Sequence, residues 1–234
     1  MKYLLALCLL STWPVIAGDM PAFQPGNRIL FQGDSITHGG RGGDPNHFLG
    51  HGYQYIISAK YGAEYPDRKL VFLNRGVSGD TVAKLEARWK ADALDLRPEL
   101  LSILVGINDL NSGVSAQQYE AAYDRLLAET VAALPKVRLV LCEPFGLPVG
   151  HYKEARKWDS VKAELQQRRA VVAKLAAKYH APAVHFQKVF DDACQRAPAD
   201  YWIWDGFHPT YAGHQLMADE WSRTVGAYWD KHQK

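Results

Sequence analysis

Five short apolar runs recur along the chain, and polar or glycine residues follow each of them. The runs are RILFQG (28–33), KLVFLNRG (69–76), LLSILVG (100–106), VRLVLCEP (137–144) and PAVHF (182–186). Most of them are too apolar for strands with one exposed face. They therefore predict parallel strands that are buried on both faces of a sheet.

Segments with helical spacing separate these runs. In residues 116–134, apolar side chains recur every three or four positions, and Ser115 is a favourable N-cap. Similar stripes cover residues 53–61, 80–94, 155–179 and 211–229. Alternating strands and helices predict an open, doubly wound α/β sheet with right-handed crossovers. Because such sheets bind ligands beyond the carboxyl ends of their strands, the polar residues after each run are the candidates for chemistry.

The size and charge of the chain exclude several classes of protein. Its 234 residues fit one α/β domain, and 47% hydrophobic with 22% charged residues is an ordinary globular balance. The 27 basic and 25 acidic residues are interspersed and give a formal charge of +2. Since no basic patch of the kind that binds nucleic acid stands out, we expect no nucleic-acid partner.

The N-terminus, MKYLLALCLLSTWPVIAGDM, has the pattern of a signal peptide. Lys2 precedes an apolar run, and the small-residue cleavage site ends at Ala17. The run is too short to span a bilayer, so we expect no stable membrane insertion. The predicted organisation is a signal peptide at 1–17 and a single domain at 18–234, located in a periplasm or outside the cell. A buried N-terminal strand or helix is the alternative.

Polar side chains at the ends of different strands suggest one reaction. Ser35 follows the first run, Asn108 follows the third, and Asp205 and His208 precede the last helical stripe. A serine hydroxyl is a weak nucleophile, so an imidazole must take its proton and a carboxylate must orient that imidazole. The three-residue spacing of Asp205 and His208 permits both contacts in a turn, and Pro209 suits a helix start directly afterwards. The sequence therefore predicts acyl transfer through Ser35.

Acyl transfer also needs hydrogen-bond donors for the oxyanion of the tetrahedral intermediate. The candidates are the backbone N–H groups of Ser35 and Gly76 and the side-chain amide of Asn108. Gly76 has no side chain to block an approaching substrate, and Asn108 can extend an N–H group into the site. These three residues are the predicted oxyanion hole.

Four sequence blocks carry a family resemblance. They are GDSIT around Ser35, NRGVSGD around Gly76, GINDL around Asn108 and DGFHPT from Asp205, within residues 28–226. Together and in this order, they resemble the GDSL or SGNH hydrolases, with isoleucine in place of the leucine in the family name. The resemblance implies a flavodoxin-like three-layer α/β/α sandwich with a five-stranded parallel sheet. It also implies Ser35 as nucleophile, His208 as base, Asp205 as its orienting carboxylate, and no cofactor.

Other interpretations of these polar residues are open to test. Ser35 alone fits a helix N-cap, and Asp34 is expected to brace the turn beside it. His47 and His51 are four residues apart, but without a carboxylate or cysteine at fitting spacing we expect no metal. Glu143 with Asp205 would form a glycosidase-like carboxylate pair that leaves the serine idle. Cys142 and Cys194 are consistent with a disulfide or with two free thiols.

Aromatic residues point to the substrate. Tyr201, Trp202 and Trp204 directly precede Asp205, and flat aromatic faces suit stacking on sugar rings. For a secreted esterase, this predicts removal of acetyl groups from a carbohydrate or polysaccharide ester, with these three residues as substrate contacts. Either tryptophan is equally well explained as core packing. A lysophospholipase or thioesterase acting on longer acyl chains is the alternative, followed by a non-catalytic carbohydrate-binding protein.

Overall fold

A computed structural model describes residues 20–43 and 47–232. Five parallel strands form one sheet in the order β2-β1-β3-β4-β5. The strands are β1 (Arg28–Gly33), β2 (Val71–Asn74), β3 (Leu100–Leu104), β4 (Arg138–Cys142) and β5 (Ala183–Val184). This strand order is that of flavodoxin-like folds, so the predicted fold class is confirmed.

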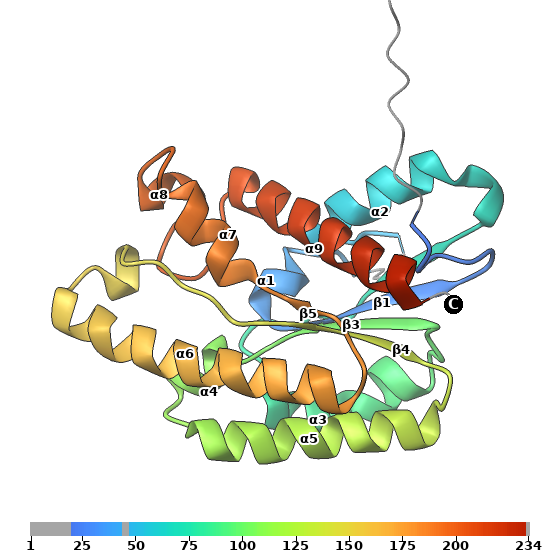
Figure 1. Cartoon of the computed structure of the whole chain (residues 1–234), viewed down its shortest axis with the longest axis horizontal. Helices are drawn as coiled ribbons and strands as arrows, with labels where there is room; N and C mark the ends of the chain where they lie inside the picture. The colour runs from blue at the N-terminus through green and yellow to red at the C-terminus, as the bar shows by residue number, and fades with distance from the viewer. Residues whose placement is uncertain (1–19, 44–46, 233–234) are drawn as a thin grey trace, which may run out of the picture.

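Helices cover both faces of the sheet and complete three layers (Figure 1). One face carries α1 (Ser35–His38), α2 (Tyr53–Glu64), α7 (Phe186–Ala193), α8 (Ala199–Trp202) and α9 (Tyr211–His232). The other carries α3 (Val82–Trp89), α4 (Ile107–Asn111), α5 (Ala116–Ala133) and α6 (Ala155–Lys178). A π-helix, η2 (Lys90–Leu94), continues α3, and η1 (Pro66–Arg68) and η3 (Gly150–Tyr152) are single 3₁₀ turns.

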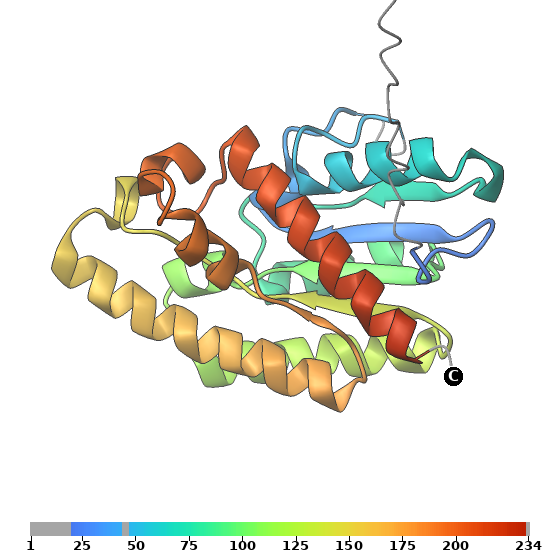
Figure 2. The same ribbon diagram turned by 45° about the horizontal axis from the view of Figure 1, so that its top comes forward.

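Each face of the sheet has its own apolar core, and each core contains a fully buried tryptophan that uses its polar atom. Trp221 of α9 donates its indole N–H to Ser102 Oγ of β3 at 2.9 Å, which fixes α9 across the sheet (Figure 2). On the opposite face, Trp89 of α3 donates to Thr130 Oγ1 of α5, also at 2.9 Å. Because a buried indole N–H is costly without a partner, both hydrogen bonds define how the helices dock.

The elements follow the predicted pattern closely, with two corrections. Ser115 caps α5 as expected, in a reciprocal capping box with Gln118. The stripe at 80–94 is not one helix, because it divides into α3 and the π-helix. The run at 182–186 is a strand only to Val184; Phe186 begins α7 instead, where it packs against Phe145.

Three predictions about the whole chain have different outcomes. The signal peptide at 1–17 lies outside the described residues. Among the helices of residues 20–43 and 47–232, none is both long and apolar enough to cross a bilayer. Cys142 is buried in β4 and Cys194 follows α7, and both are free thiols. The structure thus decides for two thiols over a disulfide.

Candidate active site

Ser35 is the first residue of α1, directly after the carboxyl end of β1. Gly33 ends β1 with φ +152°, and a Cβ there would overlap the carbonyl oxygen of Leu104 in β3. Only glycine therefore fits where β1 leaves the sheet. Asp34 caps α1, since its Oδ1 accepts the N–H of Ile36 at 3.0 Å, which confirms its predicted bracing role. These constraints place Ser35 at the sheet edge where ligands bind.

Ser35, His208 and Asp205 form one hydrogen-bonded chain. Ser35 Oγ lies 2.7 Å from His208 Nε2, and His208 Nδ1 lies 2.7 Å from Asp205 Oδ2. Asp205 Oδ1 also accepts the backbone N–H of His208 at 3.0 Å and that of Phe207 at 3.3 Å. Burial opposes ionisation of Asp205, but the hydrogen bonds from His208 and Phe207 outweigh it and lower the pKa of the carboxyl. The carboxylate is therefore ionised and holds the imidazole in place.

A tight turn before α9 positions His208. Ile203 forms an isolated antiparallel bridge with Pro209, and the Trp204 N–H donates to the His208 carbonyl at 2.9 Å. The segment therefore closes on itself, and α9 begins at Tyr211. This agrees with the helix start predicted from Pro209.

Two of the three predicted oxyanion donors, Ser35 and Asn108, each have an N–H group available for a substrate. Within the described residues, the Ser35 backbone N–H has no hydrogen-bond partner. Asn108 Nδ2 donates to the Asp80 carbonyl at 3.0 Å, which uses one of its two N–H bonds. The Asn108 amide therefore lies against the turn that contains Asp80, with one donor left.

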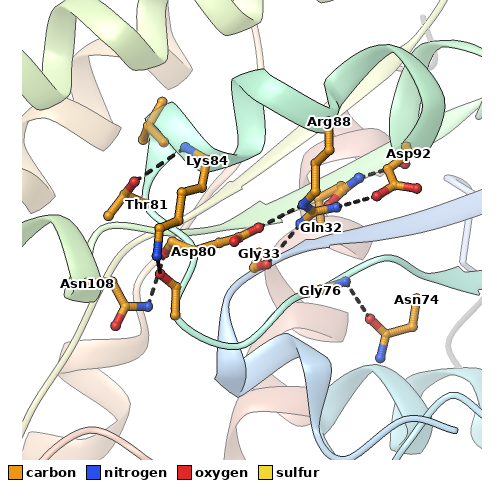
Figure 3. Close-up of polar contacts among 12 residues, drawn as sticks. Gln32, Gly33, Asn74, Gly76, Asp80, Thr81, Lys84, Arg88, Asp92 and Asn108 are labelled. Atoms are coloured by element: carbon orange, nitrogen blue, oxygen red, sulfur yellow. Dashed lines mark hydrogen bonds and ion pairs between the residues drawn. The ribbon is translucent and has the colours of Figure 1, made fainter.

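The backbone N–H of Gly76, the third predicted donor, is already used in another hydrogen bond. Its N–H donates to Asn74 Oδ1 at 2.9 Å (Figure 3), and a Cβ would lie 2.5 Å from the backbone nitrogen of His38. Gly76 therefore allows close packing of backbones and does not line the pocket beside Ser35. Gly79 is an alternative donor: it has φ +82° and lies between Ser78, which lines the pocket, and Asp80, whose carbonyl holds Asn108. Its N–H has no hydrogen-bond partner in the part of the chain described.

A network of ion pairs supports the turn that contains Gly79 and Asp80. Figure 3 shows Arg88 of α3 between two carboxylates: its Nε lies 2.7 Å from Asp80 Oδ2, and its Nη1 lies 3.0 Å from Asp92 Oδ2. Asp92 belongs to the π-helix, and its carbonyl accepts the side-chain amide of Gln32 at 2.6 Å. Through Asp80, this network fixes the carbonyl that holds the Asn108 amide.

Asp34 is an unusual carboxyl beside Ser35. Burial raises its pKa to about 7, and the neighbouring Asp109 and Asp80 carboxylates add to the shift. Its Oδ2 is buried and has no hydrogen-bond partner among the described residues. Asp109 instead accepts the N–H of Val82 at 3.2 Å, which joins α4 to the start of α3. The protonated form of Asp34 is therefore well populated near neutral pH.

A pocket of about 450 Å³ opens beside the Ser35–His208–Asp205 chain. Its wall also contains His38, His51, Ser78, Trp204, Tyr211 and His214. Of the described residues that line it, only Ile36 and Pro209 are aliphatic. The pocket is therefore walled mainly by polar and aromatic side chains.

The three aromatic residues predicted to contact substrate differ in their exposure and in whether they line the pocket. Trp204 lines the pocket and is 60% exposed, as a substrate contact requires. The prediction for Trp202 is wrong: its side chain is buried and donates its indole N–H to the Ala197 carbonyl at 3.2 Å. Tyr201 is exposed but does not line this pocket.

The alternative with two catalytic carboxylates has no geometric support. Glu143 Oε2 lies 3.0 Å from His185 Nδ1, and Oε1 accepts the Gln187 N–H at 3.0 Å. Both oxygens of Glu143 are thus engaged, and the residue lines a different pocket from Asp205.

Sequence reasoning did not assign the ring side chains of His38, His51, Tyr211 and His214 to the pocket wall. Two of them carry a detectable signal. His38 follows Ser35 by three positions and therefore lies one turn further along α1. Tyr211 is the first residue of the helix that follows the DGFHPT block. The other two reach the pocket only through tertiary packing.

The fold and this site define a serine hydrolase: a parallel α/β sheet presents a serine, a histidine and a carboxylate in hydrogen-bond contact at its carboxyl edge. Residues 31–216 match the GDSL-like lipase/acylhydrolase family, and the chain belongs to that family. It is a carboxylic ester hydrolase.

Relatives support this assignment over most of the chain. An acetylxylan esterase from Geobacillus stearothermophilus is 32% identical over 219 residues, covering 87% of this chain and 96% of the relative. Its crystal structure has a TM-score of 0.77 at 29% identity, with 88% and 96% covered. A protein described as a GDSL-like lipase from Parabacteroides merdae has a TM-score of 0.81 at 36% identity, with 87% and 97% covered. Solved catalytic mutants of the Geobacillus enzyme replace a serine, an aspartate or a histidine by alanine.

Proposed function

We propose that this esterase removes acetyl groups from a carbohydrate through an acyl-enzyme on Ser35. The observation that carries the proposal is the hydrogen-bonded chain from Asp205 through His208 to Ser35 beside a polar and aromatic pocket. The same three residue types are replaced in the catalytic mutants of the similar acetylxylan esterase.

In the first half of the reaction, His208 Nε2 takes the Ser35 hydroxyl proton as Oγ attacks the ester carbonyl carbon. Asp205 keeps the imidazole oriented and stabilises the imidazolium. The negative charge that develops on the carbonyl oxygen is stabilised by the N–H groups of Ser35 and Gly79 and by the Asn108 amide. Collapse of the intermediate breaks the ester C–O bond, and His208 returns the proton to the departing sugar oxygen.

In the second half, a water molecule attacks the acetyl carbon on Ser35. His208 now takes the proton of that water, and the same donors stabilise the second oxyanion. The intermediate releases Ser35 Oγ, which regains the proton from His208, and acetate leaves. The atoms balance as ester plus water giving sugar hydroxyl plus acetic acid, which ionises to acetate and a proton at neutral pH.

The pocket wall favours a short acyl group on a polar alcohol. A long acyl chain requires an extended apolar groove, whereas only Ile36 and Pro209 contribute aliphatic surface among the described lining residues. Acetyl, whose only aliphatic carbon is one methyl group, meets this constraint. The similar Geobacillus protein, an acetylxylan esterase, points in the same direction.

The test is hydrolysis of p-nitrophenyl esters from acetate to long acyl chains by the wild type, Ser35→Ala and Ser58→Ala. Ser58 is a half-buried serine on α2 that does not line the pocket, and it serves as the matched control. We expect activity on acetate that is lost in Ser35→Ala and unchanged in Ser58→Ala. Maximal activity on long chains would favour a lipid or thioester substrate. Hydrolysis that survives Ser35→Ala would overturn the mechanism.

We further propose that residues 1–17 are a signal peptide and that the exported protein is one domain of residues 18–234. The apolar run behind Lys2 and the Val15-Ile16-Ala17 cleavage motif support this organisation. Expression with the native N-terminus in a secreting bacterial host tests it. We expect exported protein whose mass corresponds to a start at Gly18; intact protein retained in the cytoplasm would contradict the proposal.

A further inference from the structure

Two exposed aromatic rings form a corner at the mouth of the pocket. Trp204 is 60% exposed and Tyr211 is 66% exposed, and both line the pocket. Their ring centroids are 6.3 Å apart with an interplanar angle of 82°. They flank His208 along the chain, one in the turn before it and one at the start of α9. Because exposed aromatic surface is unfavourable in water, a corner of this kind suits a ligand with an apolar face.

Two histidines in the same wall have fixed tautomers. His38 Nδ1 accepts the Gly40 N–H at 3.2 Å, and His214 Nδ1 accepts the Tyr53 N–H at 3.2 Å. Each neutral ring therefore carries its proton on Nε2 and offers only a donor there. Burial lowers the pKa of both, for His214 to about 4, so both stay neutral at neutral pH.

The aromatic pair and the histidine pair lie in the same wall of the pocket. The His51 ring lies edge-on to Tyr211, with centroids 5.8 Å apart, and edge-on to His214, with centroids 6.3 Å apart. His51 thus joins the aromatic corner to the deeper imidazole. Ring faces at the mouth and N–H donors inside match a pyranose, whose C–H face is apolar and whose hydroxyl and ring oxygens accept hydrogen bonds.

We propose that Trp204, Tyr211, His38 and His214 form a subsite for the pyranose ring that carries the acetyl group. Trp204 and Tyr211 stack on the sugar, and the two imidazole N–H groups donate to its oxygens, so the ester is presented to Ser35. This subsite rests on the proposed function. It makes the sugar, and not only the acetyl group, a determinant of specificity.

The experiment compares acetate esters of a sugar with the acetate ester of a simple alcohol. Wild type, Trp204→Ala, Tyr211→Ala and His38→Ala are assayed by pH titration on methyl tri-O-acetyl-xylopyranoside and on ethyl acetate, which has no ring. We expect each variant to lower kcat/KM for the sugar acetate at least tenfold more than for ethyl acetate, chiefly through KM. Tyr55→Ala is the matched control, because Tyr55 on α2 is 51% exposed yet lies outside the pocket wall. It should leave both activities unchanged.

Every other outcome is informative. Equal losses on both acetates, or no loss, would overturn the subsite while leaving the esterase assignment intact. If wild type hydrolyses neither ester, the proposed function fails, and calorimetric binding of the same sugar acetate to Ser35→Ala still tests the subsite. Sedimentation velocity covers the remaining case: dissociation of an oligomer on Trp204→Ala or Tyr211→Ala would show that a second copy covers the corner, which overturns the proposal.

Discussion

At the scale of the residue, Asp205 illustrates how one side chain controls another. It accepts hydrogen bonds from the His208 ring and from two backbone N–H groups, so its position depends on the turn as well as on its charge. Replacing it by asparagine preserves the shape of the residue. The change removes the charge and lets an amide N–H face His208 Nδ1, which favours the wrong tautomer.

For Asp205→Asn we expect kcat to fall on the order of 10³- to 10⁴-fold with little change in KM. Steady-state kinetics on p-nitrophenyl acetate, with circular dichroism to verify folding, measures this. Asp200→Asn, an exposed carboxylate of α8, is the control and should retain full activity. A folded Asp205→Asn protein with more than a tenth of wild-type kcat would refute the role of this carboxylate.

Asp34 presents the opposite case, a carboxyl whose neutral form is favoured by folding. Its pKa rises from 3.8 to about 7. Below about pH 4 it is protonated in both states and carries no penalty. Between about pH 4 and 7 the unfolded chain ionises while the folded chain holds its proton, so stability falls as pH rises. Above pH 7 the penalty is complete.

Asp34→Asn removes this ionisation and retains an oxygen for the Ile36 N–H. We expect the free energy of unfolding of the variant, relative to wild type, to increase by a few (~2–4) kcal/mol between pH 4 and 8. Urea unfolding across that range measures the difference. The comparison with wild type is needed because His214 also makes stability depend on pH. Its pKa is lowered to about 4, so stability rises from about pH 4 to 6.5 in both proteins, and this contribution cancels in the difference. A pH-independent difference would contradict the buried, protonated carboxyl.

At the scale of the element, α3 and the π-helix act together on the proposed oxyanion hole. The side chains of Arg88 and Asp80 are only 18% and 7% exposed, so their ion pair is shielded from solvent. A π-helix places one extra residue in a turn, and here that turn contains Asp92, the second partner of Arg88. The pairing therefore restrains Asp80, whose carbonyl holds Asn108.

For Arg88→Met we expect about a tenfold fall in kcat with an unchanged KM, because Asn108 is less well oriented for the transition state. Arg88→Lys, which keeps a charge for Asp80, should recover part of the loss. Arg125→Met is the matched control: Arg125 pairs with Glu86 between α5 and α3 at an exposed position. An effect confined to thermal stability, with kcat intact in folded Arg88→Met, would reduce Arg88 to a structural role.

The sequence predicts long elements well and short ones poorly, for a physical reason. Five buried runs and the long stripes carry enough positions to reveal a period. Helices of four or five residues, such as α1 and α4, have no measurable period, and their hydrogen bonds to caps and neighbours define them. The π-helix is invisible for the same reason, because it differs from α-helix in hydrogen bonding and not in composition.

At the scale of the whole molecule, topology explains which site residues were predictable. Ser35, Asn108 and His208 lie where strand ends meet in a doubly wound sheet, so their positions follow from the order of the elements. Gly76 and Trp202 do not follow from it. The Gly76 N–H is occupied because Asn74 accepts it, and the Trp202 indole is buried because of how α8 docks. The spacing of residues along the chain predicts neither contact.

The two cores share one sheet, so we expect a single cooperative unfolding transition. Ser102 of β3 accepts the indole N–H of Trp221, the hydrogen bond that ties α9 to the strands. Ser102→Ala leaves that buried donor unsatisfied and should cost about 1–3 kcal/mol. Because both faces pack on the same strands, the loss should lower the whole transition and not release α9 alone.

Urea unfolding followed by tryptophan fluorescence and by far-ultraviolet circular dichroism measures this. The two signals should coincide in wild type and shift equally in Ser102→Ala, whereas Ser58→Ala, which removes a solvent-exposed hydrogen bond on α2, should shift neither. A fluorescence transition that precedes the loss of helix would mean that the α9 face melts separately. The position of His208, directly before α9, would then depend on a local equilibrium, and activity would decline before the sheet unfolds.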